Sequence, residues 1–352
     1  MKFIHTADIH LGSSMESRLP HDKAAKRAAE LRHTFESMTD YAKEHDIHLI
    51  LLAGDVFDSD RPALADKQRF YDVVKNCPDI DFLYLRGNHD SETSYTETDI
   101  PNLKTFSDKI SFYEYGNARF YGLELTSDNS MDFYDTLDFS PTYKNIFMLH
   151  GQTGSSKGEG LICLPALRDK NIDYLALGHI HTYRCEKLDG RGLYAYSGCL
   201  EGRGFDETGE KGFVTVDTDH IDPIFIPFAR RTIHEIKVDI TGAKSVFHAL
   251  QTAKSRIDIP KEDMLRIIFE GETDCDTDTL LDDAYSEFSG YFCTSIKNKS
   301  LRRIDADEYK DEVSLRGEFV RCVLASPDYD DADKSRIITL GLNALDGREL
   351  RI

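Results

Sequence analysis

Short apolar runs recur along the first half of the chain, separated by longer segments of mixed polarity. The runs cover residues 2–7, 48–53, 82–85, 145–149 and 173–177, and each has the length and character of a buried strand. Between the first two, residues 22 to 45 place apolar side chains at Leu31, Phe35 and Met38, a spacing that predicts an amphipathic helix. Strands that alternate with helices predict an α/β fold with a layered, largely parallel sheet.

The remaining pattern predicts further elements and a change of organisation near residue 230. Residues 110 to 125 predict one or two strands, residues 161 to 170 a helix, and residues 183 to 196 a hairpin before a closing strand over 212 to 216. After residue 230, the pattern over residues 233 to 296 predicts the order strand, helix, strand, helix, strand. Further helices are predicted over residues 312 to 325 and 333 to 345. We therefore expect a first domain over residues 1–230, a lid over 231–326 and a helical tail over 327–352.

Each of the five apolar runs ends in side chains that can bind a metal. These are Asp8 and His10, Asp55, Asn88, His150, and His179 with His181. In parallel α/β sheets, ligands bind at the carboxyl ends of the strands, so we expect these side chains to meet at one edge. Each motif has an ordinary alternative when taken alone: Gly87-Asn88 is common in turns, and a lone His150 is more often a core or loop histidine. The recurrence at five strand ends favours a metal site.

The chemistry of this donor set indicates a two-metal centre. Carboxylate, amide and imidazole ligands together suit Mn²⁺, Fe²⁺ or Zn²⁺ better than Ca²⁺ or Mg²⁺ alone. Seven ligands exceed the needs of one metal, so we expect two ions that share one carboxylate, ~3.5–4 Å apart, at a hydrolytic site. His89 lies beside the Asn88 ligand and is left to donate a proton to the leaving oxygen.

Composition narrows the cellular context. The chain has 352 residues, with no run of apolar residues long enough for a membrane span and no signal-peptide pattern at its start. Its seven cysteines are scattered without a C-x-x-C pair, which favours a reducing cytoplasm. The net charge of −20 opposes nucleic-acid binding, although a metal cluster inverts the field around it.

The order of the motifs resembles a known family. D-x-H at residues 8–10, G-D-x-x-D at 54–58, G-N-H-D at 87–90, H-G at 150–151 and G-H-x-H at 178–181 resemble the calcineurin-like metallophosphoesterases. Arg61-Pro62, Tyr196-Ser-Gly and the Glu207 to Gly212 motif make the chain look like the SbcD-type DNA repair nucleases over about residues 1–220. The resemblance implies a layered sheet sandwich flanked by helices, with a small α+β lid.

The same resemblance implies roles for single residues. One metal would be held by Asp8, His10, Asp55 and His181, and the other by Asp55, Asn88, His150 and His179, so that Asp55 bridges. His89 matches the catalytic histidine, while Asp58 and Asp90 match residues that orient ligands. Arg61 and Arg203, near the strand ends, are candidate DNA contacts.

The implied activity is a Mn²⁺-dependent 3′-to-5′ exonuclease with some endonuclease activity in DNA repair. The implied partners are DNA, a second copy of the chain and an SMC-like ATPase of the SbcC type, which the family docks through helices after the lid. Two other functions stay open on the residues alone. The same site would serve a small-molecule phosphodiesterase or phosphatase, and a non-catalytic scaffold would have no need to keep all seven ligands and His89.

Overall fold

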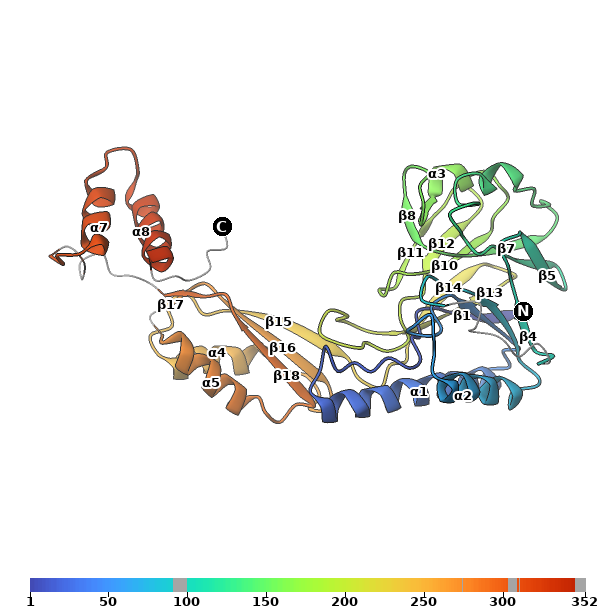
Figure 1. The fold of residues 1–352 in the computed structure, drawn as a ribbon, viewed down its shortest axis with the longest axis horizontal. Coiled ribbons are helices and arrows are strands. Elements are labelled where there is room, and N and C mark those ends of the chain that lie inside the picture. Colours follow the sequence, from blue (N-terminus) through green and yellow to red (C-terminus); the bar gives the residue numbers. More distant parts are fainter. Residues whose placement is uncertain (91–99, 274, 303–308, 310, 346–352) are drawn as a thin grey trace. The chain divides into compact units, whose positions relative to one another are not determined.

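The computed structural model describes residues 1–90, 100–273, 275–302, 309 and 311–345 (Figure 1). Within these residues the chain forms two units, Met1–Ile233 and His234–Ile352. The predicted domain boundaries, a lid over residues 231–326 and a tail over 327–352, stay predictions. Among the described residues, no helix is both long and apolar enough to cross a membrane.

The first unit contains two six-stranded sheets. In spatial order, the first sheet consists of β14 (Asp222–Pro227), β13 (Gly212–Asp217), β1 (Lys2–Thr6), β2 (Leu49–Ala53), β3 (Asp81–Leu85) and β4 (Leu103–Thr105). Strands β1 to β4 run parallel, and β13 and β14 add an antiparallel edge. This order brings the ends of β1, β2 and β3 side by side.

The second sheet repeats this plan. Its order is β11 (Arg184–Lys187), β12 (Leu193–Tyr196), β10 (Tyr174–Gly178), β7 (Lys144–His150), β6 (Ala118–Gly122) and β5 (Ser111–Tyr115). The four central strands are parallel, whereas β11 and β5 pair antiparallel at the edges. The predicted layered α/β class is confirmed, with two mixed sheets where the alternation of elements suggested one largely parallel sheet.

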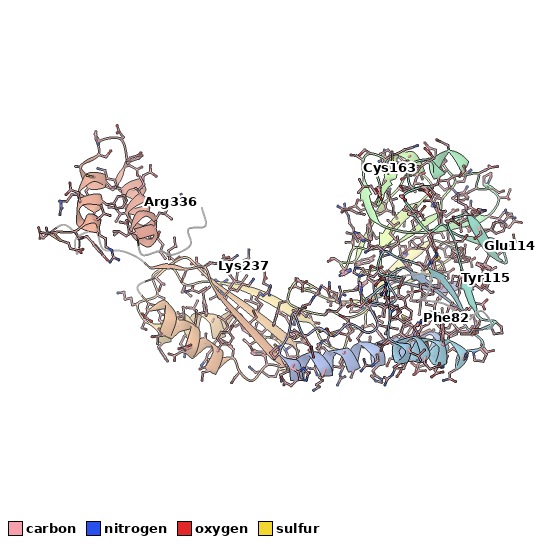
Figure 2. The ribbon with its side chains drawn as sticks, viewed as in Figure 1. Phe82, Glu114, Tyr115, Cys163, Lys237 and Arg336 are labelled. Carbon is pink, nitrogen blue, oxygen red and sulfur yellow. The ribbon has the colours of Figure 1, made fainter. Side chains whose placement is uncertain are left out.

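Apolar residues from both sheets fill the space between them. Phe3 of β1 packs edge-on against Phe120 of β6, with ring centroids 5.2 Å apart, and Leu83 of β3 joins the same core. The preceding residue, Phe82 (Figure 2), is fully buried on the opposite face of the sheet, because successive side chains of a strand alternate. All five residues of β2 are buried: the alternate side chains Leu49, Leu51 and Ala53 join this core, while Ile50 and Leu52 face the outer side of the sheet. Strands buried on both faces read as continuous apolar runs, which is why the sequence signal is strong.

Helices cover the outer face of the first sheet. They are α1 (His21–Glu44) and α2 (Leu64–Lys75), which lie along this sheet in Figure 1. Phe35 of α1 stacks on Phe70 of α2 at 5.9 Å, and Phe70 also contacts Tyr84 of β3 at 5.8 Å. The outer face of the second sheet packs against η1 (Phe133–Thr136) and α3 (Leu164–Leu167).

Two local predictions are corrected. The helix predicted over residues 161 to 170 is a strand, β9 (Leu161–Cys163), followed by the four-residue α3. Strand β9 pairs with β8 (Gln152–Gly154), and left-handed backbone at Asp169 and Asn171 follows the helix. Strand β14 was not predicted, because its two prolines argue against a central strand but are tolerated on an edge.

The second unit is a small α+β structure. Its sheet has the order β15 (Ile233–Asp239), β16 (Met264–Glu270) and β18 (Cys293–Asn298), with short strands β17 (Glu272–Thr273) and β19 (Leu301–Arg302) paired separately. Helices α4 (Val246–Arg256) and α5 (Thr277–Glu287) contribute to its apolar core. Helices α7 (Leu315–Ala325) and α8 (Asp331–Leu345) pack together through Val320, Ile338 and Leu342.

The contact between α2 and the first sheet predicts a measurable contribution to stability. Phe70→Ala should lower the free energy of unfolding by about 3–5 kcal/mol, because it leaves a cavity among three aromatic rings. The matched control is Leu64→Ala at the start of the same helix, where the side chain is 79% exposed; its effect should stay within about 0.5 kcal/mol. Denaturant titration measures both, and equal effects would contradict the packing described.

Candidate metal centre

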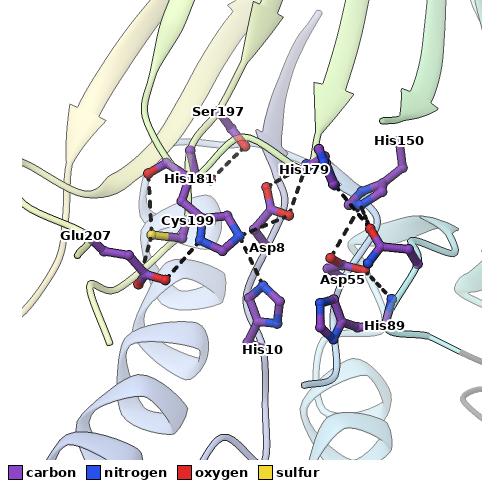
Figure 3. Close-up of polar contacts among 12 residues, drawn as sticks. Asp8, His10, Asp55, His89, His150, His179, His181, Ser197, Cys199 and Glu207 are labelled. Atoms are coloured by element: carbon purple, nitrogen blue, oxygen red, sulfur yellow. Dashed lines mark hydrogen bonds and ion pairs between the residues drawn. The ribbon is translucent and has the colours of Figure 1, made fainter. Parts of the chain in front are cut away.

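The chain bends sharply where three strands end. Asp8, His10, Asp55 and His179 all have left-handed backbone, with φ values of 51°, 53°, 51° and 104°. Such a conformation costs a non-glycine residue about 1–3 kcal/mol and persists where the surrounding structure enforces it, often at functional sites. Here the bends turn side chains from β1, β2 and β10 toward one edge of the sandwich (Figure 3).

Hydrogen bonds hold these bends in register. The amide of Asp8 donates to the carbonyl of Gly54 at 3.0 Å, and the amide of His10 donates to the carbonyl of Asp55 at 3.0 Å. The amide of His179, from the second sheet, donates to both carboxylate oxygens of Asp8, at 3.0 and 2.9 Å. The two sheets are therefore joined at the site itself.

Two glycines allow the loops to approach closely. A Cβ atom on Gly54, which has a φ of +93°, would lie 2.2 Å from Nδ1 of His150. A Cβ atom on Gly87 would lie 2.2 Å from Oδ1 of Asp55. Any larger residue at either position would clash with the side chain of His150 or Asp55.

The first donor group consists of Asp8, His10 and His181. One oxygen or nitrogen from each lies within 4.8 Å of the others. The Nε2 atoms of His10 and His181 are 3.3 Å apart, and Nε2 of His181 is 3.8 Å from Oδ1 of Asp8 (Figure 3). The three side chains thus converge on one small space.

The second donor group lies next to the first and shares Asp8. It combines Asp8 with Asp55 and His150, whose Nε2 is 3.3 Å from Oδ2 of Asp55. Oδ1 of Asn88 lies 3.1 Å from Nε2 of His150 and 3.1 Å from Nδ1 of His179. All seven predicted ligands are therefore brought to one edge of the fold.

The positions of the seven side chains indicate how they would be divided between two metal ions. His181 lies with Asp8 and His10, while His179 lies with Asn88 and His150, in line with the predicted split of the histidine pair. Asp8 belongs to both groups, whereas Asp55 belongs to the second. The bridging role of Asp55 stays a prediction.

His89 is exposed at the open side of this cluster. Its backbone amide donates to Oδ1 of Asp55 at 2.8 Å, and its ring lies 5.1 Å from the ring of His10, centroid to centroid. The side chain can therefore face both the donor groups and solvent. Its role in proton donation stays a prediction.

The two aspartates predicted to orient ligands contact the site differently. Oδ1 of Asp58 lies 3.1 Å from Nδ1 of His10. Asp90 is buried and accepts hydrogen bonds from the amides of Phe57 and Gly87, both at 3.0 Å. Burial raises the pKa of Asp90 to about 6. Asp90 thus fixes the backbone of two ligand loops, while Asp58 contacts a ligand directly.

Glu207 is a site residue to which the sequence assigned no role. Its Oε1 accepts a hydrogen bond from Nδ1 of His181 at 2.9 Å. Its position in the motif from Glu207 to Gly212 was the one signal available, because the contact spans 26 residues without any periodicity.

Arg203, one of the two candidate DNA contacts, is 5% exposed, and its guanidinium is bonded to Asp58 and Glu207. Its contact with DNA stays a prediction. Arg61, the other candidate, is exposed.

The protonation states suit metal binding. Burial lowers the pKa of His10 and, with the charge of His150, that of His179, so both imidazoles are neutral at pH 7 and free to bind a cation. Burial also opposes a charge on His150, but its contact with Asp55 outweighs this and raises its pKa to about 9. Among the described residues, the ion-pair partners of Asp8 and Asp55 are histidines rather than lysine or arginine. Divalent cations therefore fit this donor set.

A cavity of about 390 Å³ opens beside the second donor group. Arg86 lies in its wall and is held by Glu124, whose two carboxylate oxygens each accept from Nε at 2.9 Å. The rest of the lining is Gly87, Asn88, Asp90, Leu125, Thr126, Ser127, His150, Gly151, Glu159, Gly160 and His179. A substrate bound here would contact the proposed ligands directly.

A family model described as calcineurin-like phosphoesterase matches residues 1–183, more than half of the 352 residues. The chain belongs to the calcineurin-like phosphoesterase family. This phosphoesterase is thus a metal-dependent hydrolase of phosphoesters, and its two donor groups agree with the dimetal site of the family. The predicted family is confirmed, and the narrower assignment to the SbcD-type nucleases stays a prediction.

Three known proteins are similar to this phosphoesterase. The uncharacterized metallophosphoesterase YhaO of Bacillus subtilis (strain 168) is 29% identical over 272 residues, which cover 70% of this chain and 65% of YhaO. The DNA double-strand break repair protein Mre11 of Haloferax volcanii is 24% identical over 97% of this chain and 75% of its own. The solved structure of TT1561 of Thermus thermophilus aligns over 63% of this chain and 96% of its own, at 12% identity and a TM-score of 0.43. This chain spans slightly less than two thirds of YhaO.

The two donor groups predict that the histidine pair serves different ions. His181→Ala should weaken binding of the Mn²⁺ ion near Asp8 and His10, and His179→Ala that of the ion near Asn88 and His150. Each single variant should retain one tightly bound ion per chain, and the double variant should retain none. Metal analysis after gel filtration measures this, and a double variant that still holds one ion would refute the split.

The charge state of His150 predicts that metal binding releases a proton. Because the pKa of this imidazole is about 9 without metal, an ion must displace its proton at neutral pH. At pH values below that pKa, Mn²⁺ affinity should therefore increase by up to about tenfold for each unit by which the pH is raised. Calorimetry in two buffers of different ionisation enthalpy measures the proton count, which His150→Ala should lower. An affinity that is the same at pH 6.5 and 8.5 would contradict the assignment.

Proposed function

We propose that this phosphoesterase is a nuclease that hydrolyses phosphodiester bonds at DNA ends during DNA repair, with 3′-to-5′ exonuclease and some endonuclease activity. The observation that carries the proposal is the likeness to the Mre11 protein of Haloferax volcanii, which covers 97% of the chain. That match extends beyond residues 1–183 of the phosphoesterase model and includes the second unit. Phosphoesterases of many substrates share the catalytic fold, so a likeness limited to that fold would not favour DNA over other phosphoesters as the substrate.

The proposed cofactors are two divalent ions, most favourably Mn²⁺, held by the seven ligands predicted from the sequence. When bound, such ions polarise the phosphate and lower the pKa of a water molecule, which makes it a nucleophile at neutral pH. His89 would donate a proton to the leaving oxygen from the open side of the cluster. Asp90 would keep the Gly87 amide, and with it the loop that bears His89, in place.

The net charge of −20 requires that any DNA contact be local. In the first unit, Arg61 is exposed on the loop after β2 and is a proposed phosphate contact. In the second unit, Lys297 and Lys299 are exposed around the end of β18. Exposed cations that contact the phosphates would reduce the repulsion that the rest of the surface exerts.

The proposed protein partners are a second copy of the chain and an SMC-like ATPase of the SbcC type, in the cytoplasm. The sequence predicted helices over residues 312 to 325 and 333 to 345, and the structure has α7 and α8 there, packed as a pair. Val313 and Leu315, at the start of this pair, are 100% and 72% exposed. Exposed apolar side chains beside this helix pair support docking of the ATPase there.

A second candidate is a phosphodiesterase or phosphatase that acts on a small molecule. The cavity of about 390 Å³ beside Asn88 favours it, because its volume suits a compact ligand. Its wall also includes Glu159, whose carboxylate would repel a polyanionic strand, whereas the charge of Glu124 is paired with Arg86.

The nuclease proposal predicts a specific loss of activity in His89→Gln. With Mn²⁺, the unaltered protein should degrade a duplex from its 3′ ends, and the variant should be slower by about 10²–10⁴-fold because it lacks the proton donor. Its metal content should not change, since His89 is not a proposed ligand. His220→Gln, at an exposed histidine of the same unit, is the matched control and should retain full activity.

Two outcomes would overturn this proposal. DNA degradation that persists in His89→Gln would refute the assigned proton donor. A small chromogenic phosphodiester that is cleaved far better than any DNA would favour the second candidate.

A further inference from the structure

A closed ring of polar contacts surrounds the first donor group. Nη1 of Arg203 donates to Oδ1 of Asp58 at 2.6 Å, and Nη2 donates to Oε1 of Glu207 at 2.7 Å. Oδ1 of Asp58 lies 3.1 Å from Nδ1 of His10, and Oε1 of Glu207 lies 2.9 Å from Nδ1 of His181. The Nε2 atoms of the two histidines are 3.3 Å apart and close the ring.

This ring determines which nitrogen of each histidine faces the site. An ionised carboxylate only accepts hydrogen bonds, so Glu207 requires a proton on Nδ1 of His181. The carboxylate of Asp58, 3.1 Å from Nδ1 of His10, likewise favours a proton on that nitrogen. The neutral imidazoles then present their Nε2 lone pairs to each other and to Asp8. Lone pairs that face each other at this distance repel unless a cation lies between them.

Nη2 of Arg203 also lies 3.3 Å from Nδ1 of His181. Both atoms carry protons, and Oε1 of Glu207 is nearer to each of them, at 2.7 and 2.9 Å. The oxygen therefore accepts from both donors.

We propose that Arg203 is a positioning residue for the metal ion of the Asp8, His10 and His181 group. Arg203 does not contact Asp8, the carboxylate of this group. It acts through Asp58, which contacts Nδ1 of His10, and through Glu207, which contacts Nδ1 of His181. The planar guanidinium presents donors in a fixed fork and can hold both carboxylates at once, which a lysine amine cannot do with the same geometry. Partners of this kind behind metal ligands contribute about 10–100-fold to metal affinity.

The surroundings of Arg203 favour orientation over a purely structural ion pair. Its own amide donates to Oε2 of Glu207 at 2.8 Å, so the loop folds back on the carboxylate that it holds. Arg18 donates to the same carboxylate at 3.1 Å, and Nζ of Lys211 donates to the carbonyl of His181 at 2.7 Å. The histidine is thus fixed at both its ring and its backbone.

The inference rests on the proposed metal ligands but not on DNA as the substrate. Arg203→Met removes the charge at similar side-chain length. Arg231→Met is the matched control, because Arg231 is 7% exposed and bonds to Glu30 away from the proposed ligands. Mn²⁺ binding is measured by calorimetry on the full chain, and circular dichroism confirms that each variant is folded.

The unaltered chain and Arg231→Met should bind two ions alike. Arg203→Met should bind one ion about 10–100-fold more weakly and the other normally. Arg203→Lys should lie between the two, since one amine can hold one carboxylate. If Arg203→Met does not fold, Glu207→Gln decides. It should weaken one ion alone and have no further effect in a His181→Ala background, because Glu207 acts through that imidazole.

Three results would overturn the inference. Arg203→Met, or Glu207→Gln in its place, could bind both ions with unaltered affinity. Arg203→Met and Arg231→Met could weaken both ions equally, which would reveal a general loss of stability. An unaltered chain that binds no Mn²⁺ would overturn the ligand set itself, and that failure is recognisable before any variant is made.

Discussion

Two buried carboxylates, Asp8 and Asp55, are the constraint on which the site depends. They are 1% and 2% exposed, and an ion removed from water in this way costs on the order of several kcal/mol unless it is paired. Their ion-pair partners among the described residues are histidines, and left-handed backbone adds strain at both aspartates. Two divalent ions would offset both costs, because they neutralise the carboxylates and are bound by the same imidazoles. The strain and buried charge of the free protein are then the features that prepare it for metal.

The fold meets this constraint by placing two parallel-centred sheets face to face. Asp8 and Asp55 follow neighbouring strands of the first sheet, and His150 and His179 end neighbouring strands of the second. Neither sheet alone has the complete ligand set, so the apolar core between them, which includes Phe3 and Phe120, also holds the site together. The bond from the His179 amide to the Asp8 carboxylate joins the two halves at the centre.

The sequence predicted the parts of this account that leave a local signal. Each of the five buried strands reads as an apolar run that ends in polar side chains, so the strands and the seven candidate ligands could be read from the sequence, and the structure brings those side chains together. The apolar pattern did not divide the strands between two sheets, because an apolar run does not reveal which neighbours it pairs with; the sandwich was predicted by the family resemblance alone. Strand β14 was hidden by its prolines, and the ring around Arg203 was hidden by distance along the chain, since Asp58 and Arg203 are 145 residues apart.

The most direct test of the account is the number and position of bound ions. Anomalous diffraction from crystals grown with Mn²⁺ would locate them without reference to any activity. We expect two peaks, one contacted by Asp8, His10 and His181 and the other by Asn88, His150 and His179, with Asp55 in contact with both. A single peak, or peaks bound by other residues, would contradict a two-metal centre at this edge of the sandwich.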